Sequence, residues 1–307
     1  MNTRLKNTVM IGGMVIAWSI YYAVSKIMVD ATASPYAAGF LLRMGALVFL
    51  TAQLCATGNF MALFRQGRTV LILIVIGVFG FLLDLFANLG YAGGSLSTGT
   101  ALLKTDVLMV NIATVLIYKK KLYPSDWAGT FVMLVGVLLV LGVDFSGFAL
   151  NVYDLFFILS ALCVTANAFI IKAAQEKYKK DSDSISYYNN FVVLLLFAVF
   201  GFARGDINPS IIGCIPGFWF FVALGGLAQT GIYFFYYRNL KTHEVWVVKL
   251  YLLLMPVVSC IIGVFFLNEQ LTAKKLLGIL IVLAGAALIL LRSRINHEPP
   301  VPVKTDR

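Results

Sequence analysis

Polar side chains with helical spacing interrupt several long apolar runs of this 307-residue chain. Asp84, Asn88 and Tyr91 fall at i, i+4 and i+7, which places them on one face of a helix. A second stripe lies 145 positions further on, at Gln229, Tyr233 and Tyr236. Because a carboxylate is costly against lipid tails, we expect both stripes to line a polar, substrate-binding cavity. A polar seam between packed helices is the alternative.

Two lysines within apolar runs, Lys104 and Lys249, are related by the same shift of 145 positions. Beside a cavity, each would offer a mobile point charge to a substrate carboxylate or phosphate, and snorkelling to the membrane interface is the alternative. Trp246, three residues before Lys249, is expected to share its face and could stack on an aromatic substrate or belong to an interfacial belt. Asp106 is two residues from Lys104 and does not share its face.

Two further features of the first two apolar runs could serve a substrate path. Trp18, Tyr22 and Ser25 form another i, i+4, i+7 stripe, whose aromatic rings could line the path or pack in the core or belt. Asn167 lies near the repeat-equivalent position. Arg43 lies well inside an apolar run and needs a partner, either a helix C-terminus or a neighbouring carboxylate.

The composition defines the elements that hold these residues. The chain is 60% hydrophobic and 12% charged, with a mean hydropathy of +0.89, which excludes an ordinary water-soluble domain. The net charge of +10 does not indicate a nucleic-acid partner, because excess Lys and Arg in a membrane protein mark cytoplasmic loops. The four cysteines show neither paired nor metal-ligand spacing, so we predict no cofactor and no metal site.

The apolar runs are long enough for transmembrane helices and lack the period-2 alternation of barrel strands. They predict an all-α membrane protein with ten transmembrane helices. The expected spans are 8–29, 36–56, 70–90, 98–118, 127–143, 152–172, 186–203, 216–238, 244–267 and 275–291. The first run imitates a secretory signal, with Ala31-Thr32-Ala33 as a cleavage-like site, but we expect it to be retained as a helix.

The distribution of basic residues predicts the orientation. With a cytoplasmic N-terminus, 17 of the 24 Lys and Arg residues lie in cytoplasmic segments, 3 lie on the opposite side and 4 lie within spans. We therefore expect both termini in the cytoplasm. Residues 294–307 are expected to form a disordered cytoplasmic tail, since they include Pro299, Pro300 and Pro302.

An internal duplication accounts for the paired positions. Besides the shift of 145, a shift of 149 pairs Gly129 with Gly278 and Gly136 with Gly285. We predict two five-helix repeats, residues 1–146 and 147–293. Because five is odd, the second repeat is expected to enter the bilayer inverted, which is typical of secondary transporters.

The chain resembles the ten-helix EamA-type transporters of the drug/metabolite transporter superfamily. The resemblance rests on Trp18-Ser19, Lys26, Pro35 and Arg43, and on Pro256, Glu269-Gln270-Leu271-Thr272, Gly278 and Gly285. In the first half, Lys120 and Asn111 depart from the pattern. The resemblance implies a small-molecule carrier of the bacterial inner membrane. The aromatic-rich spans are similar to the YddG type, whose members export aromatic and other neutral amino acids.

The favoured hypothesis is a secondary transporter that exports aromatic or neutral amino acids by alternating access, with the lipid bilayer and a small-molecule substrate as its partners. A carrier for anionic or phosphorylated metabolites is the rival within transport. A polytopic membrane enzyme is the rival from another class, disfavoured because HExxH and GxSxG motifs are absent from the sequence. A channel is disfavoured because no filter segment is visible.

Overall fold

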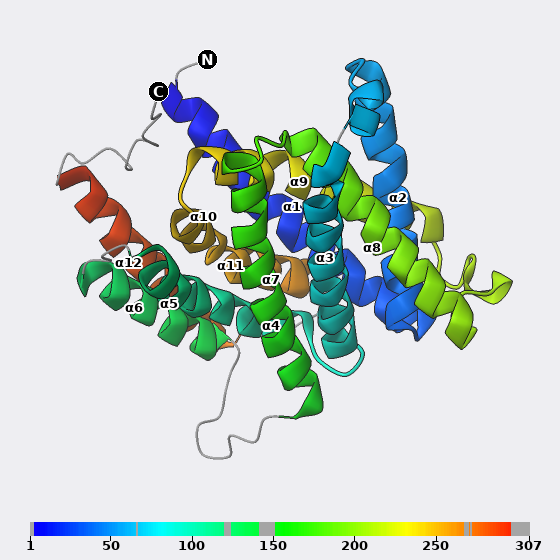
Figure 1. Cartoon of the computed structure of the whole chain (residues 1–307). Coiled ribbons are helices and arrows are strands. Elements are labelled where there is room, and N and C mark those ends of the chain that lie inside the picture. Colours follow the sequence, from blue (N-terminus) through cyan, green and yellow to red (C-terminus); the bar gives the residue numbers. More distant parts are fainter. Residues whose placement is uncertain are drawn as a thin grey trace.

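The computed structural model describes residues 3–65, 67–119, 124–140, 151–266, 270 and 272–295. Within these ranges every regular element is a helix, which confirms the all-α prediction (Figure 1). The α-helices are α1 (Thr3–Thr32), α2 (Pro35–Ala56), α3 (Val70–Tyr91), α4 (Leu96–Leu102), α5 (Asp106–Tyr118), α6 (Pro124–Val140), α7 (Val152–Glu176), α8 (Ser182–Arg204), α9 (Phe218–Thr242), α10 (Val245–Leu252), α11 (Met255–Phe266) and α12 (Ala273–Ile295). The 3₁₀ helices are η1 (Phe60–Arg65), η2 (Gly67–Thr69), η3 (Leu103–Thr105) and η4 (Pro209–Ile211).

Seven helical segments of the described residues are long and apolar enough to cross a membrane. Six of them are α1, α2, α3, α7, α8 and α9, and the seventh is the run Val245–Phe266 that joins α10 and α11. The other three predicted spans correspond to α4 with α5, to α6 and to α12, whose apolar segments are shorter in the described residues. Some positions of the sequence analysis lie outside the described residues. They are the predicted tail from residue 296 onward and the single residues Lys120, Glu269 and Leu271.

Two of the predicted spans are broken rather than continuous. The run from 245 to 266 ends one helix at Leu252 and begins another at Met255, because Pro256 has no N–H for the carbonyl four residues earlier. The connection is tightened by 3₁₀ bonds from Leu253 N to Leu250 O (3.0 Å) and from Leu254 N to Tyr251 O (3.2 Å).

The run from 96 to 118 is broken at the 3₁₀ turn η3. There the hydroxyl of Thr105 donates to Leu102 O (2.8 Å) and so competes for a helix carbonyl. The α-helical hydrogen bonding of these two spans is therefore interrupted, although Val245–Phe266 still forms one segment long and apolar enough to cross a membrane. Lys104 lies within η3, in the first break, and Lys249 lies in α10, about one turn before the second break.

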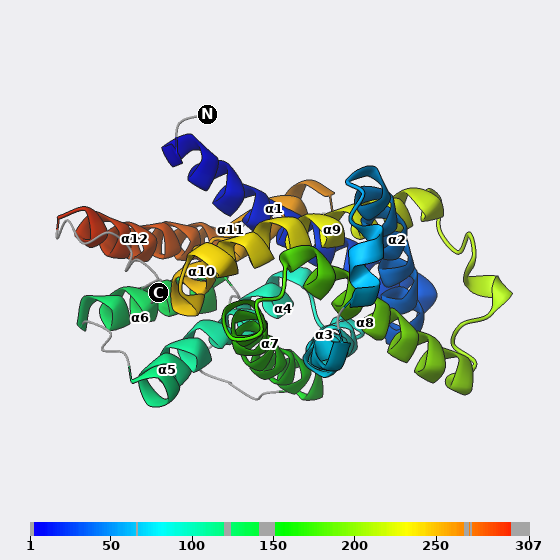
Figure 2. The same ribbon diagram turned by 45° about the horizontal axis from the view of Figure 1, so that its top comes forward.

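Helices from the two ends of the sequence interleave. Helix α1 packs along α9, α3 along α7 and α8, and α2 along α8 and α9, while α6 packs along α12. Figures 1 and 2 show α6 and α12 together at one side of the molecule, away from α2 and α8. The central helices α1, α2, α3, α7, α8 and α9 thus form the group that can enclose a shared site.

Glycines permit the closest helix crossings. A Cβ on Gly226 of α9 would lie 2.4 Å from the backbone carbon of Gly45 in α2, so the two helices touch backbone to backbone there. A Cβ on Gly136 of α6 would lie 2.7 Å from Gly278 O in α12. In a membrane the hydrophobic effect does not drive helices together, so small residues at the contact allow the close van der Waals packing that holds the helices to each other.

Candidate functional site

A central cavity lies between six helices, α1, α2 and α3 from the first half of the chain and α7, α8 and α9 from the second. Water-sized molecules fit into about 40 Å³ of it. Binding pockets for small molecules have volumes of roughly 300–1,000 Å³, so a substrate could enter only if the helices moved apart. The lining residues are Trp18, Tyr21, Arg43, Gly80, Leu83, Asp84, Val164, Asn167, Ala168, Ile171, Asn189, Gln229, Ile232, Tyr233, Tyr236 and Tyr237.

A buried ion pair between α2 and α3 supplies the charge of the cavity. Arg43 donates through Nε to Asp84 Oδ2 (2.7 Å) and through Nη2 to the same oxygen, and Tyr21 OH also donates to it (2.8 Å). The two charged side chains are 3% and 2% exposed. Asp84 is thus the carboxylate partner that Arg43 needs inside an apolar helix.

The guanidinium of Arg43 also joins the two halves of the chain. Its Nη1 donates to the hydroxyl of Tyr233 in α9 and to Asn190 Oδ1 in α8 (3.4 Å). Asn190 Nδ2 donates back to the backbone oxygen of Arg43 (3.0 Å). Because Arg43 contacts α3, α8 and α9, a ligand that competes for it would alter how these helices are held together.

Two amide oxygens in the cavity wall have no hydrogen-bond partner within the described residues. They are Asn167 Oδ1 in α7 and Asn189 Oδ1 in α8, both buried. The amide nitrogen of Asn189 donates to Tyr237 OH, which orients its oxygen away from that hydroxyl. Buried acceptors are normally satisfied, so these oxygens are available to a donor that the protein itself does not provide.

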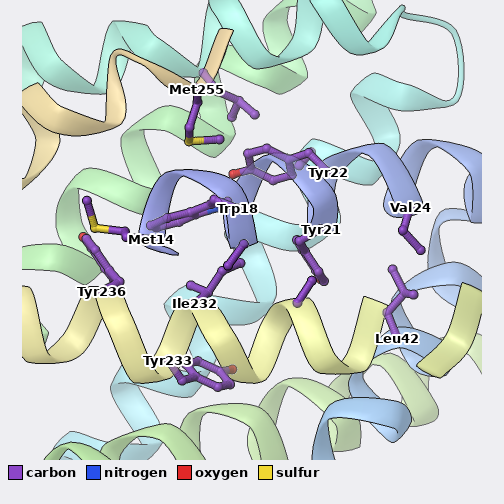
Figure 3. Packing of buried hydrophobic residues seen from close by; sticks show 14 of the residues in the cluster. Met14, Trp18, Tyr21, Tyr22, Val24, Leu42, Ile232, Tyr233, Tyr236 and Met255 are labelled. Carbon is purple, nitrogen blue, oxygen red and sulfur yellow. The ribbon is translucent and has the colours of Figure 1, made fainter. Parts of the chain in front are cut away.

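Aromatic rings form much of the remaining wall. Trp18 of α1 and Tyr236 of α9 meet edge to face, with ring centroids 4.7 Å apart. Figure 3 shows Trp18 and Tyr21 on α1 beside Ile232 and Tyr236 on α9. Trp18 is 7% exposed, so it packs inside the bundle and does not belong to an interfacial belt. An apolar wall with a few fixed polar groups is the usual composition of a small-molecule site.

Comparison with known proteins identifies the family. Residues 7–142 and again residues 151–291 match the EamA-like transporter family. The chain belongs to this family. It is similar to an uncharacterized transporter encoded in the cobO 3' region of a Sinorhizobium species, with 35% identity over 111 residues, which is 36% of this chain and 77% of the relative. A known crystal structure shares the fold, with a TM-score of 0.71 and 17% identity over 94% of this chain and 99% of the other.

Membership of the EamA-like family determines the general activity. The chain belongs to a family described as transporters, so it is a membrane transporter. The apolar helices agree with a multi-pass protein in a lipid bilayer.

The structure divides the predicted site residues of this EamA-like transporter into two groups. Those that line the cavity are Trp18, Asp84, Gln229, Tyr233 and Tyr236. Those that do not are Tyr22, Asn88, Tyr91, Lys104, Trp246 and Lys249. The helical-face rule alone could not separate them, because neighbouring positions of one stripe lie at different depths along the bundle.

Four residues of the second group serve packing. Asn88 accepts a hydrogen bond from Ser25 Oγ (2.7 Å) and donates to Pro35 O (3.1 Å), which is the polar seam that the sequence left as the alternative. Tyr22 and Tyr91 pack on each other, with centroids 6.1 Å apart. Trp246 is half-buried against other core residues and does not reach the cavity.

The two paired lysines lie beside the cavity wall, outside the cavity itself. Lys249 is fully buried and its Nζ lies 2.8 Å from Asp106 Oδ2, so it does not snorkel. Its ammonium stands 5.6 Å from the ring centroid of Trp18 and 5.4 Å from that of Tyr236, both of which line the cavity. Lys104 is 4% exposed, and its Nζ contacts Met255 Sδ at 3.3 Å.

Sequence reasoning missed Asp106 as a partner for either lysine. It compared Asp106 only with Lys104 on the same segment, whereas the contact is with Lys249, 143 positions away in the other half. The available signal was that a carboxylate inside an apolar run requires a cation. Tyr21, Asn189 and Tyr237, which also line the cavity, were not singled out either.

Proposed function

We propose that this EamA-like protein is a secondary transporter that exports aromatic and other neutral amino acids across the bacterial inner membrane by alternating access. The observation that carries this proposal is that one buried cavity holds both members of the Arg43–Asp84 ion pair, an aromatic wall, and the Asn167 Oδ1 atom, which has no hydrogen-bond partner among the described residues. These are the groups that a zwitterion with an apolar side chain requires.

A zwitterionic amino acid matches the charges of this cavity. Its carboxylate can bind Arg43 and its ammonium can bind Asp84, so each buried charge exchanges one opposite partner for another. Asn167 Oδ1 offers a further acceptor to the ammonium. A solute without charged groups could not replace the ion pair in this way, and separating Arg43 from Asp84 would then leave two bare charges in a buried site.

The aromatic wall favours substrates with a planar or large apolar side chain. Trp18, Tyr233 and Tyr236 present ring faces and edges to the same cavity. Aromatic pairs contribute about 0.5–1.5 kcal/mol beyond the area that they bury. Because only about 40 Å³ of the cavity admits water-sized molecules, these rings and the helices that carry them must move apart to admit a substrate.

We infer that the chain has ten membrane spans arranged as two inverted five-helix repeats, residues 1–146 and 147–293, with both termini in the cytoplasm. The separate family matches to residues 7–142 and 151–291 support the division. The packing also supports it, since α1 lies on α9 as α7 lies on α3. The sequence has no GxxxxGK[ST] loop, so we propose that transport is not driven by ATP.

A carrier for anionic or phosphorylated metabolites is the second candidate. It is favoured by Lys104, a buried cation that forms no ion pair with a carboxylate among the described residues. A phosphate or a second carboxylate on the substrate could supply the missing charge. The two candidates differ in where the anion binds, because Arg43 lines the cavity and Lys104 does not.

Transport in proteoliposomes tests the proposal. Vesicles containing the purified protein and loaded with unlabelled phenylalanine should accumulate labelled phenylalanine, tyrosine or tryptophan by exchange, faster than labelled alanine. Organic phosphates added outside should not compete. If organic phosphates compete and amino acids do not, the anion carrier replaces the proposal.

Asn167→Leu provides the matched site test. Loss of a hydrogen bond to a charged group weakens binding by about 1.5–3 kcal/mol, so the KM for phenylalanine should rise about tenfold or more. Asn208→Leu, at an exposed loop asparagine, is the control and should leave KM unchanged. An unchanged KM in Asn167→Leu would remove Asn167 from the site.

A further inference from the structure

Two lysines outside the cavity occupy equivalent positions in the two halves. Lys26 in α1 and Lys172 in α7 are 146 positions apart, and each is followed at i+4 by a carboxylate, Asp30 and Glu176, which are also 146 positions apart. Each ammonium group binds the C-terminal end of another helix in its own half: Lys26 binds the end of α3, and Lys172 binds the end of α9. Sequence analysis gave neither lysine a role in binding.

The first contact, here the α7–α9 clamp, consists of Lys172, Glu176 and the end of α9. Lys172 Nζ donates to Leu240 O (2.6 Å) and to His243 O (3.0 Å), and lies 3.1 Å from Glu176 Oε1. Helix α9 ends at Thr242, so these are carbonyls at its C-terminus, where a cation is favourable. The lysine is 4% exposed and the glutamate 48% exposed.

The second contact, here the α1–α3 clamp, consists of Lys26, Asp30 and the end of α3. Lys26 Nζ donates to Tyr91 O (3.0 Å), the last residue of α3, and to Asp30 Oδ1 (2.6 Å). Lys26 is 19% exposed and, among the described residues, binds one backbone carbonyl, whereas Lys172 binds two. The α7–α9 clamp is therefore the tighter of the two.

The clamps lie at opposite ends of the cavity. Asn239, next to Leu240 in α9, donates to Met10 O in α1 (3.1 Å), so the α7–α9 clamp is level with Met10. Lys26 is 16 residues further along α1, about 24 Å at 1.5 Å per residue. Trp18 and Tyr21, which line the cavity, lie between these two levels. In Figure 1, α7 ends at the top of the molecule and the α3–α4 connection lies at the bottom.

We propose that the two clamps are the gates of the carrier, which open alternately; this inference rests on the transport mechanism proposed above. In the closed gate the ammonium holds the helix C-terminus. When that helix end moves away, the ammonium keeps its carboxylate at i+4, so opening does not leave a bare charge. The partly exposed positions of Glu176 and Asp30 suit this role, because water can solvate each carboxylate whether the gate is closed or open.

Cysteine accessibility tests the gates without any substrate. Val164, a cavity-lining residue, is replaced by cysteine in a chain whose native cysteines Cys55, Cys163, Cys214 and Cys260 are changed to alanine. A membrane-impermeant maleimide is then applied from either face, using right-side-out and inverted vesicles. The α7–α9 clamp lies beside the exposed residues Lys177 and Lys179, so the positive-inside rule predicts that it is on the cytoplasmic side.

Lys172→Met should raise the rate of labelling from the cytoplasmic face by about fivefold or more, which corresponds to the low end of typical coupling free energies, about 1 kcal/mol. The rate of labelling from the outer face should not change. Lys26→Met should do the opposite. Lys177→Met, an exposed lysine five positions from Lys172, is the control and should change neither face. Lys172→Arg keeps a cationic donor and should label as the parent does.

Variants of the carboxylates give a second test that does not remove a buried lysine. Glu176→Gln should slow labelling from the cytoplasmic face, and Asp30→Asn should slow it from the outer face. In each variant the lysine of the open gate has no carboxylate partner at i+4, so the open state is populated less. The proposal is overturned if folded lysine variants label equally from both faces or not at all, or if the carboxylate variants leave labelling unchanged. Correct gating with no amino-acid exchange would overturn the substrate class and retain the gates.

Discussion

Replacing Lys249 by methionine isolates the buried charge of Asp106. The pair is 2.8 Å apart with side chains 0% and 2% exposed, so water does not screen it. Removing one partner of such a pair costs about 3–5 kcal/mol, because the other charge is left without compensation. We therefore expect Lys249→Met to lower the free energy of unfolding by that amount.

The double variant Lys249→Met/Asp106→Leu separates the pair from its parts. Replacing a whole buried ion pair by apolar residues is often neutral or stabilising, so the double variant should recover most of the loss. The coupling energy from the four proteins should exceed about 2 kcal/mol. The assay is reversible chemical unfolding in detergent micelles, monitored by the tryptophan fluorescence and the helical circular dichroism.

Arg204→Met is the control, because the Arg204 side chain is 61% exposed beside Asp206 and exposed pairs contribute no more than about 1 kcal/mol. The reasoning is refuted if Lys249→Met costs no more than this control. It is also refuted if the double variant is as unstable as the sum of its single variants, since the two side chains would then not be coupled.

Three other predictions concern packing and the cavity wall. Gly226→Ala should destabilise the protein by about 1–3 kcal/mol, because the methyl would meet the α2 backbone at 2.4 Å. Gly12→Ala, whose methyl would meet no atom of the described residues within 4 Å, should change stability by under about 1 kcal/mol, and thermal unfolding compares the two variants. Trp18→Leu should reduce exchange of tryptophan more than that of alanine, whereas Trp219→Leu, 59% exposed on α9, should affect neither rate. Asn88→Leu should lower the stability by about 1–3 kcal/mol, because Ser25 Oγ and Pro35 O lose their hydrogen-bond partner. The KM of transport should not change, and thermal unfolding together with transport kinetics checks both results.

Much of the fold follows from local sequence. The ranges expected for the first three spans, 8–29, 36–56 and 70–90, agree closely with α1, α2 and α3. This succeeds because spanning lipid requires about 20 apolar residues in a row, a property of one continuous segment. The interruptions at η3 and before Met255 were not predicted, because hydropathy averages over the few residues whose hydrogen bonds change from the α-helical to the 3₁₀ pattern.

The candidate site was predicted in part. The stripes on α3 and α9 contributed Asp84, Gln229, Tyr233 and Tyr236 to the cavity, since one helical face does point in one direction. Asn88 on the same stripe serves a seam instead, because the depth at which neighbouring helices cross determines which residue of a face meets open space. That depth depends on packing partners far away in the sequence.

The sequence by itself determined that this chain is an all-helical membrane protein with few buried polar groups, because the cost of polar atoms in hydrocarbon acts on every segment independently. Only the tertiary structure decided which of these groups meet. The contacts of Arg43 with Asp84 and of Lys249 with Asp106 span 41 and 143 positions. Whether a buried charge serves a ligand, an ion pair or a helix end depends on which helix packs against it, and no spacing within one helix contains that information.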